Sequence, residues 1–341
     1  MNKRCPCLFF TPLLVLMLAL VAAPPLFAQN KAPQDFGFRY LQMPFQQDPV
    51  NILVLSQKGQ EQKKKPLLLF IQGSLPIPLI IYDEQGVYGT FPFRTTELLQ
   101  HYHLAIVGKP FIPVVIESKY LPPNFTFLDP DTGHFPVEYS ERNILDYYVA
   151  RNLAVISYLK EQPWVSNQQL VLAGHSEGST IAAKMATLSP EITHLVYSGG
   201  NPLGRIMSFI ARARAIEDSQ AESDLLYWQY VINNSESLDG SEGDTPKTTY
   251  QFSLPPLHNL LQLEIPVLVT YGTKDTAAIF NDYLRVETMR QQKSNFTYKA
   301  YSGLEHNYFG LTPTGEVDYN NYNWDNVVQD WLEWLQQPAK K

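Results

Sequence analysis

A serine near the middle of the chain has the surroundings of an activated nucleophile. The pentapeptide 174–178 (Gly-His-Ser-Glu-Gly) follows the apolar run 170–173 and precedes a stretch of small residues. Glycines two positions either side of a serine let a strand turn sharply into a helix and leave the hydroxyl exposed. We therefore predict that Ser176 is a nucleophile at a strand-to-helix turn. The alternative interpretation is a purely structural turn.

A serine hydroxyl needs a base to take its proton and a carboxylate to hold that base in the useful tautomer. His306 lies in a loop between the apolar run 296–301 and a closing helix, so we expect it at the carboxyl edge of a sheet. Asp275 follows the run 266–271 and is our choice of carboxylate. Asp282 is the alternative, although a solvated helix position explains it better. The other histidines are expected to be packing or surface residues: His101, His103, His134, His175, His194 and His258.

A tetrahedral intermediate also needs N–H donors for its oxygen. One is the backbone N–H of Glu177, and a second is expected from the segment 70–74 (Phe-Ile-Gln-Gly-Ser), where Gly73 permits a close approach of the backbone. We expect the N–H groups of Ser74 and Glu177 to hold this oxygen, each contributing roughly 3 kcal/mol. The alternative for 70–74 is an ordinary turn after a strand.

Short apolar runs that could position these residues alternate with amphipathic stretches. Continuous Val, Leu and Ile runs indicate strands covered on both faces, which predicts an α/β fold with a mostly parallel central sheet flanked by helices. The first two predicted strands are expected to form an antiparallel edge. Strands are predicted at 50–56, 67–72, 104–107 with a ragged continuation to 114–116, 169–173, 192–198, 266–271 and 296–301. Helices are predicted at 141–159, with Ser140 as N-cap, and at 178–188, 279–291 and 323–335.

Residues 202–262 do not fit this alternation. They contain helical pieces at 206–216 and 221–232, followed by a polar loop. We interpret them as a cap or lid insertion that would lie over the site. The core domain is then predicted to consist of residues 29–201 and 263–341.

The first 28 residues are typical of a secretory signal peptide. A basic start is followed by the apolar run 8–23 and by small residues near Ala28, where we expect cleavage. An uncleaved membrane anchor is the alternative, but this run is shorter than the roughly 20 apolar residues of a spanning helix. We therefore expect a secreted or periplasmic protein without a stable membrane anchor.

The mature chain would be acidic and free of cysteine. Cleavage would remove Cys5 and Cys7 and also Lys3 and Arg4, which changes the net charge from −7 to −9. This leaves no disulfides, no cysteine-ligated metal and no basic field for nucleic acid. No helix-spaced His/Glu ligand set and no glycine-rich phosphate loop with a following lysine occurs, so no metal or cofactor is expected.

In its order of oxyanion loop, serine turn, acid and histidine, the chain resembles the α/β-hydrolase superfamily over residues 50–335. The segments 70–74 and 172–180 look like those of bacterial esterases and dienelactone-hydrolase-like proteins. One departure is Gln72, which replaces a histidine common before the oxyanion glycine; it changes the support of the loop but leaves the mechanism possible. The resemblance implies site residues Gly73, Ser74, Ser176, Glu177, Asp275 and His306.

These observations together predict an exported serine hydrolase that cleaves carboxylic esters through an acyl-enzyme. Its partner would be a small-molecule ester or acyl substrate. A serine peptidase or acyltransferase with the same triad is one alternative, because fold and triad are shared by enzymes with many substrates. A non-catalytic binding protein that retains the fold is the other.

Overall fold

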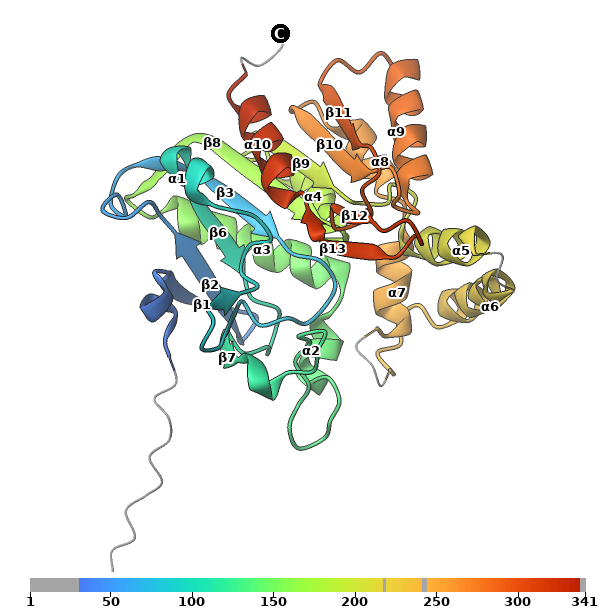
Figure 1. The fold of residues 1–341 in the computed structure, drawn as a ribbon, viewed down its shortest axis with the longest axis horizontal. Helices are drawn as coiled ribbons and strands as arrows, with labels where there is room; N and C mark the ends of the chain where they lie inside the picture. The colour runs from blue at the N-terminus through green and yellow to red at the C-terminus, as the bar shows by residue number, and fades with distance from the viewer. Residues whose placement is uncertain (1–30, 217–218, 241–243, 338–341) are drawn as a thin grey trace, which may run out of the picture. The chain divides into compact units, whose positions relative to one another are not determined.

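Eight of the apolar or half-apolar runs form one central sheet. A computed structural model describes residues 31–216, 219–240 and 244–337 (Figure 1). The predicted signal peptide, its cleavage site and both cysteines lie outside the described residues. In spatial order the sheet consists of β1 (Arg39–Phe45), β2 (Asp48–Leu55), β6 (His103–Val107), β3 (Lys65–Ile71), β8 (Val165–His175), β9 (His194–Ser198), β10 (Val267–Gly272) and β11 (Phe296–Tyr301).

The strands from β6 to β11 in this order are parallel, and β1 and β2 form an antiparallel edge. The prediction that the strands at 50–56 and 67–72 pair with each other is wrong, because β6 lies between β2 and β3. The partner of β2 is instead β1, a strand that was not predicted from the sequence. Its side chains are only partly buried. The hairpin turn uses positive φ angles at Gln46 and Gln47 rather than a glycine that would have marked it.

Helices cover both faces of the sheet. Successive side chains of a strand point to opposite faces, and in β3 the side chains of Leu67 and Leu69 share one buried cluster while Leu68 belongs to another. The first cluster packs against α3 (Leu145–Lys160), α4 (Glu177–Leu188) and α9 (Ala278–Arg290). The second packs against α1 (Thr96–His101) and α10 (Trp324–Leu335).

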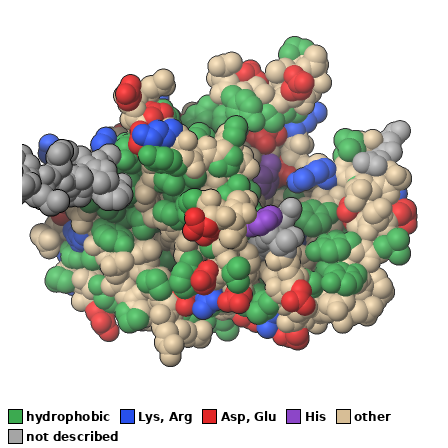
Figure 2. Space-filling view, turned by 90° about the horizontal axis from the view of Figure 1, so that it is seen from below, with side chains coloured by type: hydrophobic (Ala, Val, Ile, Leu, Met, Phe, Trp, Pro, Cys, Tyr) green, Lys and Arg blue, Asp and Glu red, His purple; other side chains and the backbone are tan. Residues whose placement is uncertain are grey.

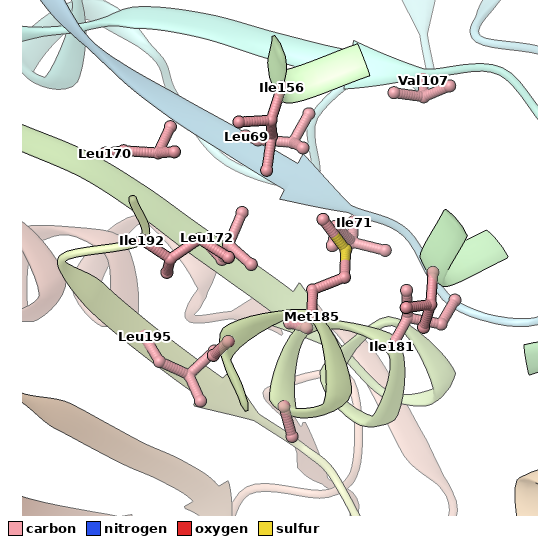
Figure 3. Close-up of a cluster of buried hydrophobic side chains, with 14 of the residues drawn as sticks. Leu69, Ile71, Val107, Ile156, Leu170, Leu172, Ile181, Met185, Ile192 and Leu195 are labelled. Carbon is pink, nitrogen blue, oxygen red and sulfur yellow. The ribbon is translucent and has the colours of Figure 1, made fainter. Parts of the chain in front are cut away.

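The packing of α4 fixes the helix that follows the predicted nucleophile. Figure 3 shows Met185 of this helix directed toward Ile71 of β3, and Ile181 belongs to the same buried cluster. Both helix side chains are at most 1% exposed. Burying an aliphatic side chain of this size stabilises the fold by about 1.5–3 kcal/mol, so the start of α4 is held firmly against the sheet.

Two predicted elements differ in the structure. The helix expected at 141–159 is divided into α2 (Val137–Arg142) and α3, because Ile144 has an extended backbone, and Ser140 lies inside α2 rather than at an N-cap. The expected continuation of strand 104–107 belongs to a separate small sheet, made of β4 (Ile80–Tyr82), β5 (Val87–Tyr88) and β7 (Val115–Glu117).

Four helices connect β9 to β10 and occupy the predicted insertion. They are α5 (Arg205–Ala215), α6 (Gln220–Asn233), α7 (Pro246–Ser253) and α8 (Leu257–Gln262). The helix α7 falls partly within the polar loop expected there; its first turn is capped by the Thr245 hydroxyl, which accepts the N–H of Thr248. Figure 1 shows α5, α6 and α7 beside one end of the sheet. The helices α7 and α8 contribute Phe252 and Leu260 to the main core.

The remaining elements are short. They are the 3-10 turns at Pro33–Phe36 and Ser118–Tyr120 and a hairpin of β12 (Phe309–Leu311) and β13 (Val317–Tyr322). None of the helices in the described part of the chain has the length and apolar character that a membrane span requires.

Candidate active site

The turn between β8 and α4 holds Ser176 in a strained backbone conformation. Its φ is 57° and its ψ is −125°, backbone angles that residues with a Cβ seldom adopt. The flanking glycines are required by space. A Cβ on Gly174 would lie 2.2 Å from the carbonyl oxygen of Gly178, and one on Gly178 would lie 2.0 Å from that of Ile71. The glycines therefore let β8, α4 and β3 approach each other closely around the serine.

The three side chains predicted to form a triad lie in one hydrogen-bonded row. The Nε2 atom of His306 is 2.9 Å from Oγ of Ser176, and its Nδ1 atom is 2.7 Å from Oδ2 of Asp275. They follow the parallel strands β8, β10 and β11, whose carboxyl ends meet at one edge of the sheet. The alternative acid, Asp282, lies in α9 and accepts a hydrogen bond from Tyr271 at 2.6 Å. The structure thus brings Asp275, and not Asp282, to the histidine.

The charges of this row are mutually stabilised. Burial of Asp275 opposes its ionisation, but the hydrogen bond and positive charge of His306 and the N–H of Ala277 outweigh burial and lower its pKa below the ordinary value. Burial likewise lowers the pKa of His306, yet the hydrogen bond and charge of Asp275 leave that pKa raised. A raised pKa makes the imidazole a stronger base, which suits it to accept a proton from Ser176.

His175, which was predicted to be a packing or surface residue, is a buried neutral histidine beside the row. Its ring centroid lies 5.1 Å from that of His306 and 4.7 Å from that of Trp324. Burial, with a smaller contribution from the charge of His306, lowers the pKa of His175 to about 3. Its Nδ1 atom is 3.0 Å from the hydroxyl of Ser198, which in turn contacts the hydroxyl of Tyr308 at 2.7 Å.

The side chain of Glu177 lies in a buried ionic cluster. Its carboxylate accepts from the ammonium group of Lys109 at 3.0 Å and from the guanidinium group of Arg205, which also binds Asp244 at 2.8 Å. Neither basic residue was predicted as part of the site. A lone lysine directly after the apolar strand β6 was the available signal for Lys109, whereas no local pattern marks Arg205, at the start of α5.

The predicted oxyanion loop lies against the serine. A Cβ on Gly73 would be 3.5 Å from the Cβ of Ser176, so the backbone approaches as expected. The Gln72 amide donates to the carbonyl of Val107 at 3.3 Å, and the Ser74 carbonyl accepts from Tyr139 at 3.1 Å. No described residue accepts a hydrogen bond from the Ser74 N–H. That the N–H groups of Ser74 and Glu177 bind an oxyanion remains a prediction.

A cavity of about 450 Å³ opens at Ser176 and His306. It is lined by the predicted oxyanion residue Ser74, by the insertion and by the loops after β10 and β11. The space-filling view in Figure 2 shows histidine side chains at a hollow of the surface with basic side chains nearby. Volumes of this size accommodate small-molecule ligands.

Most of the other histidines have partners of their own. His103 is bonded to Ser56 at 2.7 Å and to the carbonyl of Lys63 at 2.8 Å, and His194 lies 3.3 Å from the Gln169 amide. Within the part of the chain that the structure describes, no three histidine or acidic side chains gather as a metal site would require.

Comparison with known proteins agrees with this arrangement. A model of the family described as "BAAT / Acyl-CoA thioester hydrolase C terminal" matches residues 153–236, which include the serine turn and α5. A comparison with curated proteins found no match. Among solved structures, Est1E from Butyrivibrio proteoclasticus is similar with a TM-score of 0.53 and 13% identity, over 87% of this chain and 97% of that protein.

Two further structures are similar at the level of the fold. A putative dienelactone hydrolase from Klebsiella pneumoniae subsp. pneumoniae matches with a TM-score of 0.51 and 14% identity, over 88% of this chain and 98% of that one. An acylaminoacyl peptidase from Pyrococcus horikoshii matches with a TM-score of 0.56 and 12% identity over 89% of this chain. The present chain spans only 42% of the length of that peptidase. The sheet order, the serine turn and these likenesses agree, and the chain has the α/β-hydrolase fold.

Proposed function

We propose that the chain is an exported serine hydrolase that cleaves carboxylic esters or thioesters through an acyl-enzyme. The observation that carries this proposal is the row of two hydrogen bonds, 2.9 Å and 2.7 Å long, that joins Ser176 through His306 to Asp275. The family match, whose description names a thioester hydrolase, supports a substrate with an acyl group that can be transferred to the serine.

In the proposed reaction, the Ser176 oxygen attacks the acyl carbon while Nε2 of His306 takes the hydroxyl proton. The negative charge that develops on the carbonyl oxygen is held by the N–H groups of Ser74 and Glu177. The leaving alcohol or thiol departs with the proton from His306, which leaves an ester between the acyl group and the serine. A water molecule then loses its proton to His306 and attacks this ester, which releases the acid and restores Ser176.

The direct test is labelling of Ser176 by a fluorophosphonate. The control is Ser302→Ala, which changes an exposed serine in the loop between β11 and His306. The wild-type protein and this control should both be labelled. Ser176→Ala should not be labelled, and its kcat should fall by about 10⁵-fold or more. Persistent turnover in Ser176→Ala would reject the nucleophile.

The substrate class is tested with matched p-nitrophenyl esters, acyl thioesters and aminoacyl p-nitroanilides of graded chain length. We expect turnover of esters or thioesters. Turnover of anilides alone would favour a peptidase, and transfer of the acyl group to an added amine would favour an acyltransferase. Absence of both labelling and turnover would favour a binding protein.

The export proposal rests on the basic and apolar composition of residues 1–28. Expression of the full chain in a bacterial host should place the protein outside the cytoplasm. Sequencing of its amino terminus should show cleavage near Ala28. A full-length protein retained in the cytoplasm would contradict it.

A further inference from the structure

Two basic side chains at the cavity have no acidic partner among the residues that the structure describes. Arg212 of α5 and Lys274 of the loop after β10 both line it. Neither side chain makes a hydrogen bond or an ion pair with any described residue. The other cation of the lining, Arg205, is bonded to Glu177 and Asp244. Within the described part of the chain, Arg212 and Lys274 are therefore two cations without an ion-pair partner beside the proposed nucleophile.

Two of the three acidic groups that line the cavity are paired with other basic side chains. Glu177 is bonded to Lys109 as well as to Arg205, and Asp275 is bonded to His306. The carboxylate of Glu305 accepts the backbone N–H groups of Asn307 at 2.7 Å and of Phe309 at 3.0 Å. These N–H groups are neutral, so Glu305 keeps its negative charge, but no described ion pair joins it to Arg212 or Lys274.

The position of Arg212 relative to the reacting atoms has electrostatic support. Burial lowers the pKa of His306 most, the hydrogen bond and charge of Asp275 and then the charge of Glu305 raise it, and the positive charge of Arg212 lowers it by a smaller amount. The guanidinium group thus acts on the imidazole across the cavity. A ligand that reaches Ser176 would lie within the field of the same guanidinium group.

We infer that this cavity takes an ester or thioester whose acyl or leaving group carries a carboxylate, bound by Arg212 and Lys274. The inference rests on the proposed function and names its substrate class. The planar guanidinium group matches the two oxygens of a carboxylate, and an ammonium group adds a second point of attraction. The apolar side chains of Phe209 and Phe252 in the same lining would contact the hydrocarbon part.

The test compares charged and neutral substrates of equal length. Mono-p-nitrophenyl glutarate and p-nitrophenyl pentanoate differ by a carboxylate in the acyl part, and 4-acetoxybenzoate and 4-acetoxybenzamide differ by one in the leaving group. We expect kcat/KM to favour the charged member of at least one pair about tenfold, the effect of one charge-assisted hydrogen bond. The pair that shows the preference assigns the carboxylate to that part of the substrate, and high salt should weaken it.

Variants identify the residues responsible. Arg212→Gln and Lys274→Gln should each reduce the ratio of charged to neutral kcat/KM severalfold, and Arg212→Lys should retain part of it. Arg214→Gln is the matched control, because Arg214 lies on the same helix but pairs with Glu222 outside the cavity lining. The ratio in this control should equal that of the wild-type protein.

The outcomes separate the two proposals. Equal kcat/KM for both members of both pairs, or an unchanged ratio in Arg212→Gln and Lys274→Gln, overturns the carboxylate inference while fluorophosphonate labelling of Ser176 still supports the hydrolase. Absence of Ser176 labelling and of ester and thioester turnover overturns the proposed function, and the carboxylate inference with it.

Discussion

The Nε2 atom of His175 lies 3.3 Å from the amide oxygen of Asn307. The residue before Ser176 is therefore hydrogen-bonded to the residue after His306. An amide oxygen can only accept, so Nε2 of His175 donates, and Nδ1 of the neutral ring accepts from the Ser198 hydroxyl. This contact between buried His175 and exposed Asn307 ties the serine turn to the loop that carries the proposed base.

The buried state of His175 predicts how stability depends on pH. Its pKa is lowered to about 3 in the folded protein, against about 6.5 in an unfolded chain. Between these values the unfolded chain binds a proton that the native state does not, so stability falls as the pH falls through this window. From pH 7 to pH 4.5 the loss attributable to His175 should be about 3 kcal/mol.

His175→Gln should remove this part of the pH dependence, because an amide does not titrate but still offers a donor and an acceptor. Urea unfolding of both proteins at pH 7 and pH 4.5 measures it. Other groups contribute to acid sensitivity in both proteins, so the difference between the two slopes isolates His175. His101→Gln changes an exposed histidine and should leave the slope as in the wild-type protein. Parallel pH profiles for His175→Gln and wild type would contradict the account.

Asp275 is expected to set the pKa of His306. Burial alone would lower that pKa, and the hydrogen bond and charge of Asp275 raise it. Asp275→Asn should therefore lower the pKa of His306 below 6.5, as followed by NMR titration of its ring protons. Activity should fall by about 10⁴-fold, as for the same exchange in another serine hydrolase.

Asp282→Asn is the control for this exchange. The carboxylate of Asp282 in α9 accepts a hydrogen bond from Tyr271 of β10 and makes none with the imidazole of His306. Both the pKa of His306 and the activity should stay close to those of the wild-type protein. A pKa of His306 that is equally affected by both exchanges, or by Asp282→Asn alone, would mean that the acid is misassigned.

The sequence carries strong signals for the parts of the site that depend on local chain geometry. Ser176 needs glycines on both sides because the turn is sterically tight. Asp275 and His306 follow apolar strands, which places them at a common sheet edge once the strands are parallel. These signals were sufficient to choose the three side chains that the structure brings together.

Features that depend on distant contacts left weaker signals. The strand β1 pairs with β2 through a turn at Gln46 and Gln47 that contains no glycine. The side chains of β1 are only partly buried, so its sequence lacks the apolar run that would mark it as a strand. Arg205 and Lys109 reach Glu177 from segments far apart in the sequence. A single charged residue in an otherwise ordinary segment shows its role only after the chain has folded.

The close packing at Gly178 predicts a clear effect of one added methyl group. Alanine is favoured over glycine within a helix by about 1 kcal/mol. At this position, however, a Cβ would lie 2.0 Å from the carbonyl oxygen of Ile71, so α4 must move away from β3. Gly178→Ala should lower the free energy of unfolding by at least about 2 kcal/mol and reduce labelling of Ser176.

Gly108→Ala is a matched exchange without this conflict, since the nearest atoms to its Cβ would be at 3.6 Å, an ordinary contact. Chemical denaturation of the two variants compares them directly. A Gly178→Ala protein as stable as Gly108→Ala would show that the turn can relax. The glycine would then not be required by space.

The ion pair between Glu177 and Arg205 is expected to hold the start of α5 against the serine turn. The two side chains are 3% and 12% exposed, so their interaction is little screened by solvent. A double-mutant cycle with Glu177→Gln and Arg205→Gln should give a coupling free energy of about 1–3 kcal/mol. The single exchange at Glu177 should also be costly, because it leaves Lys109 buried without an anion.

The pair Arg214 and Glu222, between α5 and α6, provides the comparison. Its side chains are 57% and 68% exposed, and an exposed pair should couple by less than about 1 kcal/mol. Both cycles are measured by urea unfolding under the same conditions. If the coupling free energy of Glu177 and Arg205 were no larger than that of the exposed pair, this ion pair would not hold α5 against the serine turn. The position of α5 beside the cavity would then depend on apolar contacts such as those of Ile206, which is 5% exposed.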